Sequence, residues 1–67
     1  MAITLKAARV NAGLTQKEAA EKIGVSVSTL AYFEQGKRFP NVPQILTIEK
    51  LYGVGFNDII FLTNSTI

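Results

Sequence analysis

Apolar residues recur every three or four positions along most of this chain, and glycines stand where the pattern stops. That spacing puts apolar side chains on one face of a helix. It predicts helices over residues 5–12, 16–23, 27–35 and 42–52. A last short helix is expected over residues 56–62. No segment of the sequence is a credible strand, because none shows the regular alternation of apolar and polar residues.

Residues that favour helix ends stand at the predicted boundaries. Thr15 is expected to be the N-cap of the second helix, with Glu18 three residues later completing a capping box. Ser26 can cap the third helix in the same way. Gly24 is expected to end the second helix in the left-handed conformation. Pro43 fits the first turn of the fourth helix, where a missing N–H has no consequence.

The length and composition of the chain limit the number of domains and the kinds of chemistry that it can have. Sixty-seven residues are enough for one small domain, which we expect over residues 1–67, with its core at 4–62 and a frayed tail at 63–67. The sequence has no cysteine and no histidine, which excludes thiolate metal sites and histidine-based catalysis. It has no phosphate-binding loop or dinucleotide motif. We therefore expect no enzyme activity, no metal and no cofactor.

Charge and hydropathy point to a cytoplasmic protein with an anionic partner. Residues 1–38 carry a net charge of +3, whereas residues 39–67 carry −1. The first half is thus biased towards an anionic partner, although a chance excess on a solvated surface would look the same. The longest apolar run, residues 59–62, is far too short to span a membrane, and the N-terminus lacks the apolar core of a signal peptide.

The segment 16–35 is the most informative part of the sequence. It contains two predicted helices joined by a turn of three residues, so the helices must approach each other closely. Ala20 is small at the expected crossing point, where a larger side chain would force the helices apart. The residues expected to form the buried seam between them are apolar: Ala19, Ile23, Val25, Leu30 and Phe33.

This segment resembles the helix-turn-helix of the phage-repressor and Cro-like (XRE-type) DNA-binding family. The likeness extends over most of the chain. Residues 5–16 resemble the family's first helix and the junction after it, and residues 33–38 with Pro40 resemble the end of its recognition helix and the basic loop that follows. Residues 51–60 resemble its link to a fifth helix. The resemblance implies an all-α, compact five-helix repressor-like domain.

The resemblance also implies how DNA is contacted. The third helix would enter the major groove while the second crosses the phosphate backbone. Val27, Ser28 and Tyr32 take the family's base-reading positions. None of them is the Arg, Gln or Asn that makes bidentate contacts with guanine or adenine. We therefore expect modest direct readout, with part of the specificity coming from DNA shape.

Four residues are candidates for phosphate contact. The family's pattern assigns this role to Gln16 and Thr29. Gln16 also stands at a predicted helix N-terminus, where free N–H groups and the helix dipole favour an anion. Lys37 and Arg38 lie in the loop after the third helix and are expected to bind phosphate, each adding one released counterion to the salt dependence. An ordinary solvated glutamine and a solvated pair of cations are the alternatives.

Two further charged positions bear on the helix packing. The family pairs an arginine of its first helix with a glutamate of its recognition helix, and Arg9 and Glu34 stand at these places. A bidentate ion pair would fix the two helices relative to each other. Two independently solvated charges are the alternative. Glu49 departs from the family, which tends to have a small residue there.

The sequence therefore predicts a DNA-binding transcriptional regulator, a repressor that inserts helix 27–35 into the major groove of a palindromic operator. Its partner would be double-stranded DNA, with no membrane and no small-molecule ligand. The alternative is a helical protein-interaction module of the same fold, because the exposed positions Val27, Ala31 and Tyr32 are only weakly polar. A stand-alone regulator, an antitoxin, a restriction controller and a domain of a larger repressor all remain open.

A homodimer is also expected. One recognition helix covers half an operator, so a palindromic site requires two copies. The last predicted helix carries more apolar residues than one of its faces can bury: Phe56, Ile59, Ile60, Phe61 and Leu62. We expect a symmetric dimer through this helix. The alternative is that Phe61 and its neighbours fold back under residues 63–67 and leave a monomer.

Overall fold

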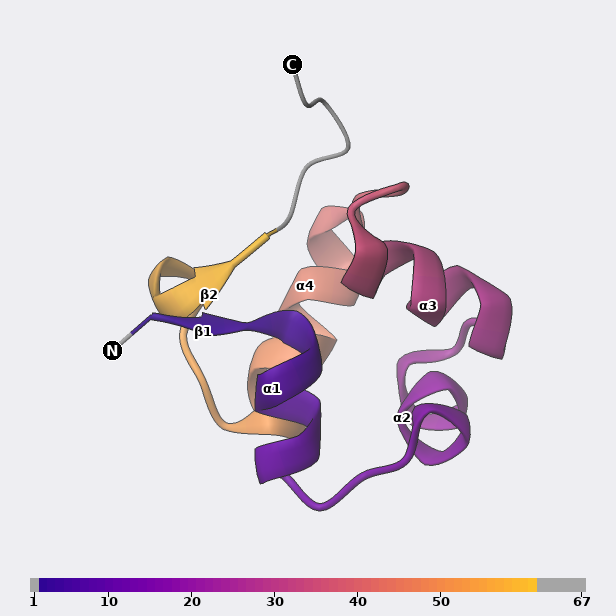
Figure 1. The fold of residues 1–67 in the computed structure, drawn as a ribbon, viewed down its shortest axis with the longest axis horizontal. Helices are drawn as coiled ribbons and strands as arrows, with labels where there is room; N and C mark the ends of the chain where they lie inside the picture. Colours follow the sequence, from indigo (N-terminus) through magenta and orange to yellow (C-terminus); the bar gives the residue numbers. More distant parts are fainter. Residues whose placement is uncertain (1, 62–67) are drawn as a thin grey trace.

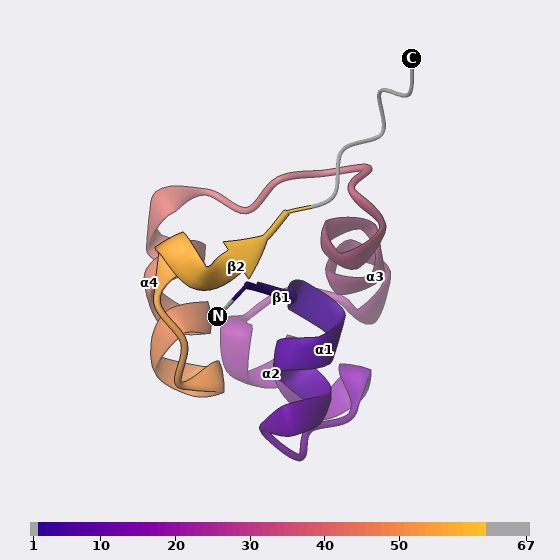
Figure 2. The same ribbon diagram turned by 60° about the vertical axis from the view of Figure 1, so that its left-hand side comes forward.

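The computed structural model describes residues 2–61, in which four α-helices are packed together and a short strand pair lies beside α1 (Figures 1 and 2). The elements in chain order are β1 (Ile3–Thr4), α1 (Leu5–Asn11), α2 (Gln16–Ile23), α3 (Val27–Gln35), α4 (Val42–Tyr52), the 3-10 helix η1 (Phe56–Asp58) and β2 (Ile59–Ile60). The four predicted α-helices are confirmed, although α1 ends at Asn11, one residue earlier than predicted.

The helix ends follow the predicted caps. The Thr15 hydroxyl accepts a hydrogen bond from the Glu18 amide at 3.1 Å, and the Glu18 carboxylate accepts one from the Thr15 amide at 2.9 Å. The hydrogen bond that the carboxylate accepts from the Thr15 backbone, and secondly an interaction with the Thr15 side chain, lower the pKa of Glu18. A second capping box joins Asn41 and Gln44 at the start of α4, with two hydrogen bonds of 2.9 Å. This second box is not among the predicted caps.

The core lies between the helices and includes one strand residue. Its fully or almost fully buried apolar side chains are Leu5, Ala8, Ala19, Ala20, Leu30, Phe33, Ile48, Tyr52 and Ile59. Ala20 is completely enclosed on α2, which agrees with the small residue expected where α2 and α3 approach. Because the interior is closely packed, the position of α3 is set by the helices behind it.

The predicted fifth helix is wrong. Only Phe56–Asp58 is helical, as a single 3-10 turn, and Ile59–Ile60 then forms β2, which pairs in parallel with β1. Ile3 stands opposite Ile59, and Thr4 stands opposite Ile60. All four residues are β-branched, which favours extended backbone when a partner strand is present. The described chain is therefore mostly helical with a small strand pair, and the expectation that it has no strand is also wrong.

Glu49 of α4 contacts the segment that replaces the predicted fifth helix. Its carboxylate accepts a hydrogen bond from the backbone N–H of Phe56, the first residue of η1. The bond connects the last part of α4 to the segment that follows it. A small residue, which the family tends to have here, would not make this contact. Leu62 and residues 63–67, which the predicted helix and tail included, lie outside the described residues.

Candidate nucleic-acid interface

The α2–turn–α3 unit has the short connection that the sequence predicted. Gly24 ends α2 with a φ of +90°, and the backbone N–H groups of Gly24 and Val25 both donate to the Ala20 carbonyl, at 2.8 and 3.0 Å. Nothing lies within 4 Å of the place where a Cβ at Gly24 would stand. Glycine is therefore required by the left-handed backbone and not by crowding. Ser26 then caps α3, accepting a hydrogen bond from the Thr29 amide at 3.0 Å.

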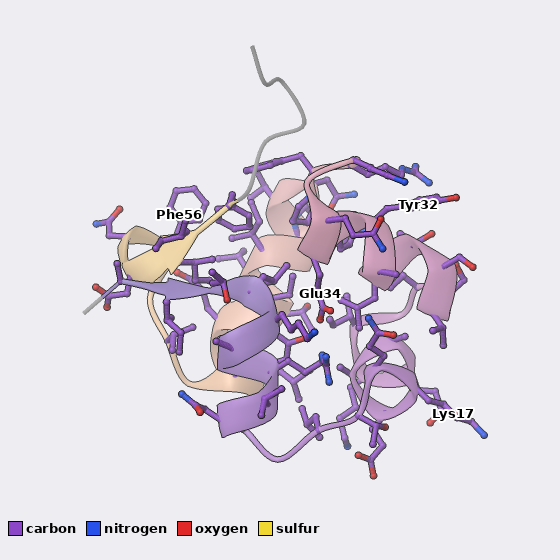
Figure 3. The ribbon with its side chains drawn as sticks, in the orientation of Figure 1. Lys17, Tyr32, Glu34 and Phe56 are labelled. Carbon is purple, nitrogen blue, oxygen red and sulfur yellow. The ribbon has the colours of Figure 1, made fainter. Side chains whose placement is uncertain are left out.

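One side of α3 is exposed, and it carries the three predicted base-reading residues. Val27 and Tyr32 keep 43% and 40% of their surface exposed, and Ser28 is exposed as well. Leu30 and Phe33 on the other side of the helix are buried. Figure 3 shows Tyr32 projecting outward from α3. The fold thus presents the predicted reading residues together on an accessible helix face.

Three of the predicted phosphate-contacting residues border this face. Thr29 is half-buried on α3, and its hydroxyl accepts a hydrogen bond from the Ser26 hydroxyl at 3.0 Å. A hydroxyl can accept and donate at once, so Thr29 keeps a donor for another partner. Lys37 and Arg38 are exposed in the loop immediately after α3. Their backbone N–H groups both donate to the Tyr32 carbonyl, at 2.9 and 3.3 Å, which folds the loop back onto the end of the helix.

Glu34 lies at the centre of a polar network that connects α1, α2 and α3. Its Oε2 atom lies 2.7 Å from Arg9 Nε, and the two side chains are only 4% and 9% exposed. The second carboxylate oxygen, Oε1, accepts a hydrogen bond from Gln16 Nε2 at 2.9 Å. Arg9 also donates through Nη1 to the Leu14 carbonyl at 2.9 Å. In Figure 3, Glu34 points in among these helices, away from the exposed face of α3.

This network differs from the predicted one in two respects. The ion pair between Arg9 and Glu34 is present, but it is not bidentate, because Gln16 takes the second oxygen of the carboxylate. Gln16 therefore has an intramolecular partner that the sequence analysis missed. Its amide nitrogen carries two N–H groups, so one remains for a phosphate. No local sequence signal indicates the contact, since Gln16 and Glu34 are brought together only by the packing of α2 against α3.

Tyr52 packs in the core close to this network. Its side chain is buried, and its hydroxyl has no hydrogen-bond partner among the described residues. Burial, and secondly the negative charge of Glu34, raise the pKa of Tyr52 to about 12, against a smaller opposing effect of Arg9. The hydroxyl therefore stays neutral at physiological pH, and Tyr52 adds no charge to the buried pair.

Lys17 belongs to the same side of the molecule, although the sequence analysis did not assign it a role. It is the second residue of α2 and is exposed. Figure 3 shows Lys17 and Tyr32 projecting from one side of the fold, and Phe56 lying on the other. Its positive charge in the first turn of α2 is the sequence signal that could have identified it.

The residues predicted to form a dimer surface are only partly available. Ile59 is buried in the core of its own chain, so its assignment to the dimer surface is wrong. Phe56 and Ile60 are exposed. Phe61 is half-buried and contacts Phe56 and Phe39, with ring centroids 5.4 and 4.7 Å apart. Phe39, Phe56 and Phe61 form what we call the aromatic cluster.

The described residues contain no group of acidic side chains that could hold a metal ion. None of the helices in residues 2–61 has the length and apolar character needed to cross a bilayer. No pocket opens on the described part of the surface.

Comparison with known proteins agrees with this geometry. The model of a helix-turn-helix family matches residues 5–59, and the chain therefore belongs to this XRE-type helix-turn-helix family. The chain is 44% identical over 50 residues to the HTH-type transcriptional regulator ImmR of Bacillus subtilis, a match that covers 75% of this chain and 39% of ImmR. It thus spans well under half the length of that relative. No solved structure matches the chain.

A second relative has a length closer to that of this chain. The uncharacterized HTH-type transcriptional regulator MJ0272 of Methanocaldococcus jannaschii is 40% identical over 55 residues, which cover 82% of this chain and 83% of the relative. The predicted family resemblance is confirmed by these matches. The α2–turn–α3 unit lies within the residues that the family model covers.

Proposed function

We propose that this protein is a DNA-binding transcriptional repressor that inserts α3 into the major groove of a palindromic operator. The observation that carries the proposal is the exposed face of α3, which combines accessible Val27, Ser28 and Tyr32 with an inward-facing Glu34. An α-helix exposed in this way fits the width of the major groove. Such a regulator works in the cytoplasm and has no enzymatic role.

Phosphate contacts would orient the helix on the duplex. Lys37 and Arg38 stand at one end of α3, and Thr29 lies near its start. Gln16, at the first residue of α2, offers its remaining amide N–H together with the free backbone N–H groups of the helix end. Lys17, exposed in the first turn of α2, adds a further positive charge on this side of the molecule. These contacts position the protein and carry no sequence information of their own.

Base readout would be modest. Val27 can pack against a thymine methyl group, Ser28 can hydrogen-bond several base edges, and Tyr32 offers a ring and a hydroxyl. Because each such contact discriminates weakly, part of the specificity comes from the shape and deformability of the operator.

The loop cations provide the direct test of DNA binding. Lys37→Ala combined with Arg38→Ala is expected to weaken binding to every duplex, random ones included, and to make the log–log salt dependence shallower by about 2. Fluorescence anisotropy with a labelled random duplex at several salt concentrations measures this slope. The matched control is Lys6→Ala with Lys50→Ala, which removes the same charge from exposed positions of α1 and α4.

The control separates a local contact from a general charge effect. If both double variants made the salt dependence shallower by the same amount, the effect would come from net charge and not from a contact between the loop and DNA. If the native chain bound no duplex even at low salt, the DNA proposal would fail. The exposed apolar Val27 on α3 would then favour the alternative of a protein-interaction module.

We further propose that the protein acts as a symmetric homodimer through the aromatic cluster and not through a helix. Phe39 is 60% exposed and Phe56 is 43% exposed, and both contact Phe61. Ile60 on β2, which directly precedes Phe61 in the sequence, is also exposed. A small domain gains stability when such apolar surface is buried by a second copy. Phe56 projects away from the exposed face of α3. In a dimer through the aromatic cluster, the exposed α3 faces of both protomers would therefore remain free for DNA.

The dimer is tested by sedimentation. Phe56→Lys is expected to shift the chain from dimer to monomer at tens of micromolar, because a buried lysine would have no partner in the interface. Val10→Lys is the matched control, since Val10 is an exposed apolar residue of α1 outside the cluster. The proposal would be refuted if the native chain sedimented as a monomer and the Phe56→Lys variant bound a palindromic duplex with the same affinity as the native chain.

A further inference from the structure

Lys37 lies against the side chain of the one aromatic residue on the exposed face of α3. Its ammonium nitrogen is 5.7 Å from the centroid of the Tyr32 ring. Among residues 2–61, this is the one cation placed over an aromatic ring. The distance is within the range of about 6 Å over which a cation is attracted to the negative face of a ring. The contact joins a predicted phosphate-binding residue to a predicted base-reading residue.

The backbone brings the start of the loop after α3 close to Tyr32. Gly36 ends α3 with a φ of +80°, which reverses the chain direction. The Lys37 and Arg38 amides then both donate to the Tyr32 carbonyl, so the loop is tied to the same residue whose ring Lys37 covers. The helix C-cap therefore holds Lys37 close to Tyr32, so the contact does not require two distant side chains to come together.

The contact restricts a side chain that is otherwise free to move. Tyr32 is 40% exposed, and an exposed tyrosine ring can rotate between rotamers on the helix surface. A cation held over one face favours the rotamer that keeps the ring beneath it. The ammonium group has three N–H donors, so it can face the ring and still donate to a phosphate oxygen. Lys37 can thus orient the ring and contact the backbone of the same duplex.

We propose that Lys37 is a positioning residue for Tyr32 and thereby determines sequence specificity, whereas Arg38 contributes affinity alone. The inference rests on the proposed DNA-binding function. It assigns different effects to two adjacent cations that a charge-based description treats as equivalent. Removing Lys37 would free the Tyr32 ring, and the ring would then spend less time in the orientation that reads the operator.

The experiment compares single variants on two kinds of duplex. The native chain first enriches its preferred sequence from a random pool, and each variant is then titrated with that duplex and with random duplex of equal length. Lys37→Ala and Arg38→Ala are each expected to make the salt slope shallower by about 1. Lys37→Ala alone is expected to lower the ratio of preferred to random affinity, by about 2- to 5-fold. Lys37→Arg is expected to retain most of the ratio, because a guanidinium group also binds an aromatic face.

Two further measurements separate orientation from direct readout. In a Tyr32→Leu background, Lys37→Ala is expected to leave the affinity ratio unchanged, since there is no ring left to position. In the free native chain, NMR is expected to show Lys37 side-chain protons shifted by the Tyr32 ring, and the shift should be lost in Tyr32→Leu. This second readout requires no DNA.

The outcomes distinguish the inference from the proposed function. Equal affinity ratios for Lys37→Ala and Arg38→Ala, with duplex binding intact, would overturn the inference and leave the proposed function in place. An effect of Lys37→Ala that persists in the Tyr32→Leu background would also overturn it, because Lys37 would then be reading DNA by itself. Failure of the native chain to bind any duplex would overturn both.

Discussion

Glu34→Ala is expected to lower the free energy of unfolding by about 3–5 kcal/mol, because it leaves the Arg9 guanidinium buried without a counter-charge. The two side chains are 4% and 9% exposed, so water can replace little of the lost interaction. The same substitution removes the acceptor of the Gln16 amide. The loss is comparable with the whole stability expected of a domain of this size, about 3–10 kcal/mol.

Urea unfolding followed by circular dichroism measures this effect. Glu21→Ala is the matched control, since it removes a carboxylate from an exposed position of α2 and should change stability by no more than about 0.5 kcal/mol. Replacing both partners, by Arg9→Met with Glu34→Leu, is expected to recover most of the loss, because no unpaired charge is then buried. A Glu34→Ala chain as stable as the Glu21→Ala control would contradict the structural role of the pair.

Leu30→Ala is expected to lower the free energy of unfolding by about 2–5 kcal/mol, through lost burial and the cavity that remains. Leu30 is completely buried on the inner side of α3. Val27 lies on the exposed side of the same helix, so Val27→Ala should change the free energy of unfolding by no more than about 0.5 kcal/mol. Comparing the two variants therefore separates the contribution of α3 to stability from the contribution of its exposed side chains to DNA binding.

Thermal unfolding and duplex titration together check this pair. Leu30→Ala should reduce DNA binding only as far as it reduces the folded fraction, and it should keep the native sequence preference. Val27→Ala should remain folded and change the preference at the base pair that Val27 faces. Similar destabilisation of both variants would mean that α3 is not oriented as the structure describes.

The local part of the fold could be predicted because it depends on residues close together in the chain. The bounds of α2 and α3 follow from Thr15 and Ser26, whose hydroxyls accept hydrogen bonds from amides three residues later, and from Gly24, which ends α2 in the left-handed conformation. Helix capping acts within about one turn, so a short stretch of sequence contains all the information. The exposed positions of α3 follow from the same helical spacing.

The segment after α4 could not be predicted in this way. The apolar spacing of residues 56–62 predicts a helix. Ile59 and Ile60 instead adopt an extended conformation because β1, from the other end of the described chain, lies beside them. A two-residue strand has no signal of its own, since its stability comes from the partner strand and from burial of Ile59 in the core.

The candidate interface also combines features that depend on local sequence with features that depend on the packing of distant segments. Which helix is exposed, where it begins and ends, and which cations follow it can all be predicted from the sequence, because capping and periodicity are local properties. The packing of distant segments, in contrast, brings Gln16 and Arg9 to the same carboxylate of Glu34 and buries Ile59, which removes it from the proposed dimer surface. These arrangements depend on which segments pack against each other, and the energy of a buried polar or apolar group is set by those neighbours.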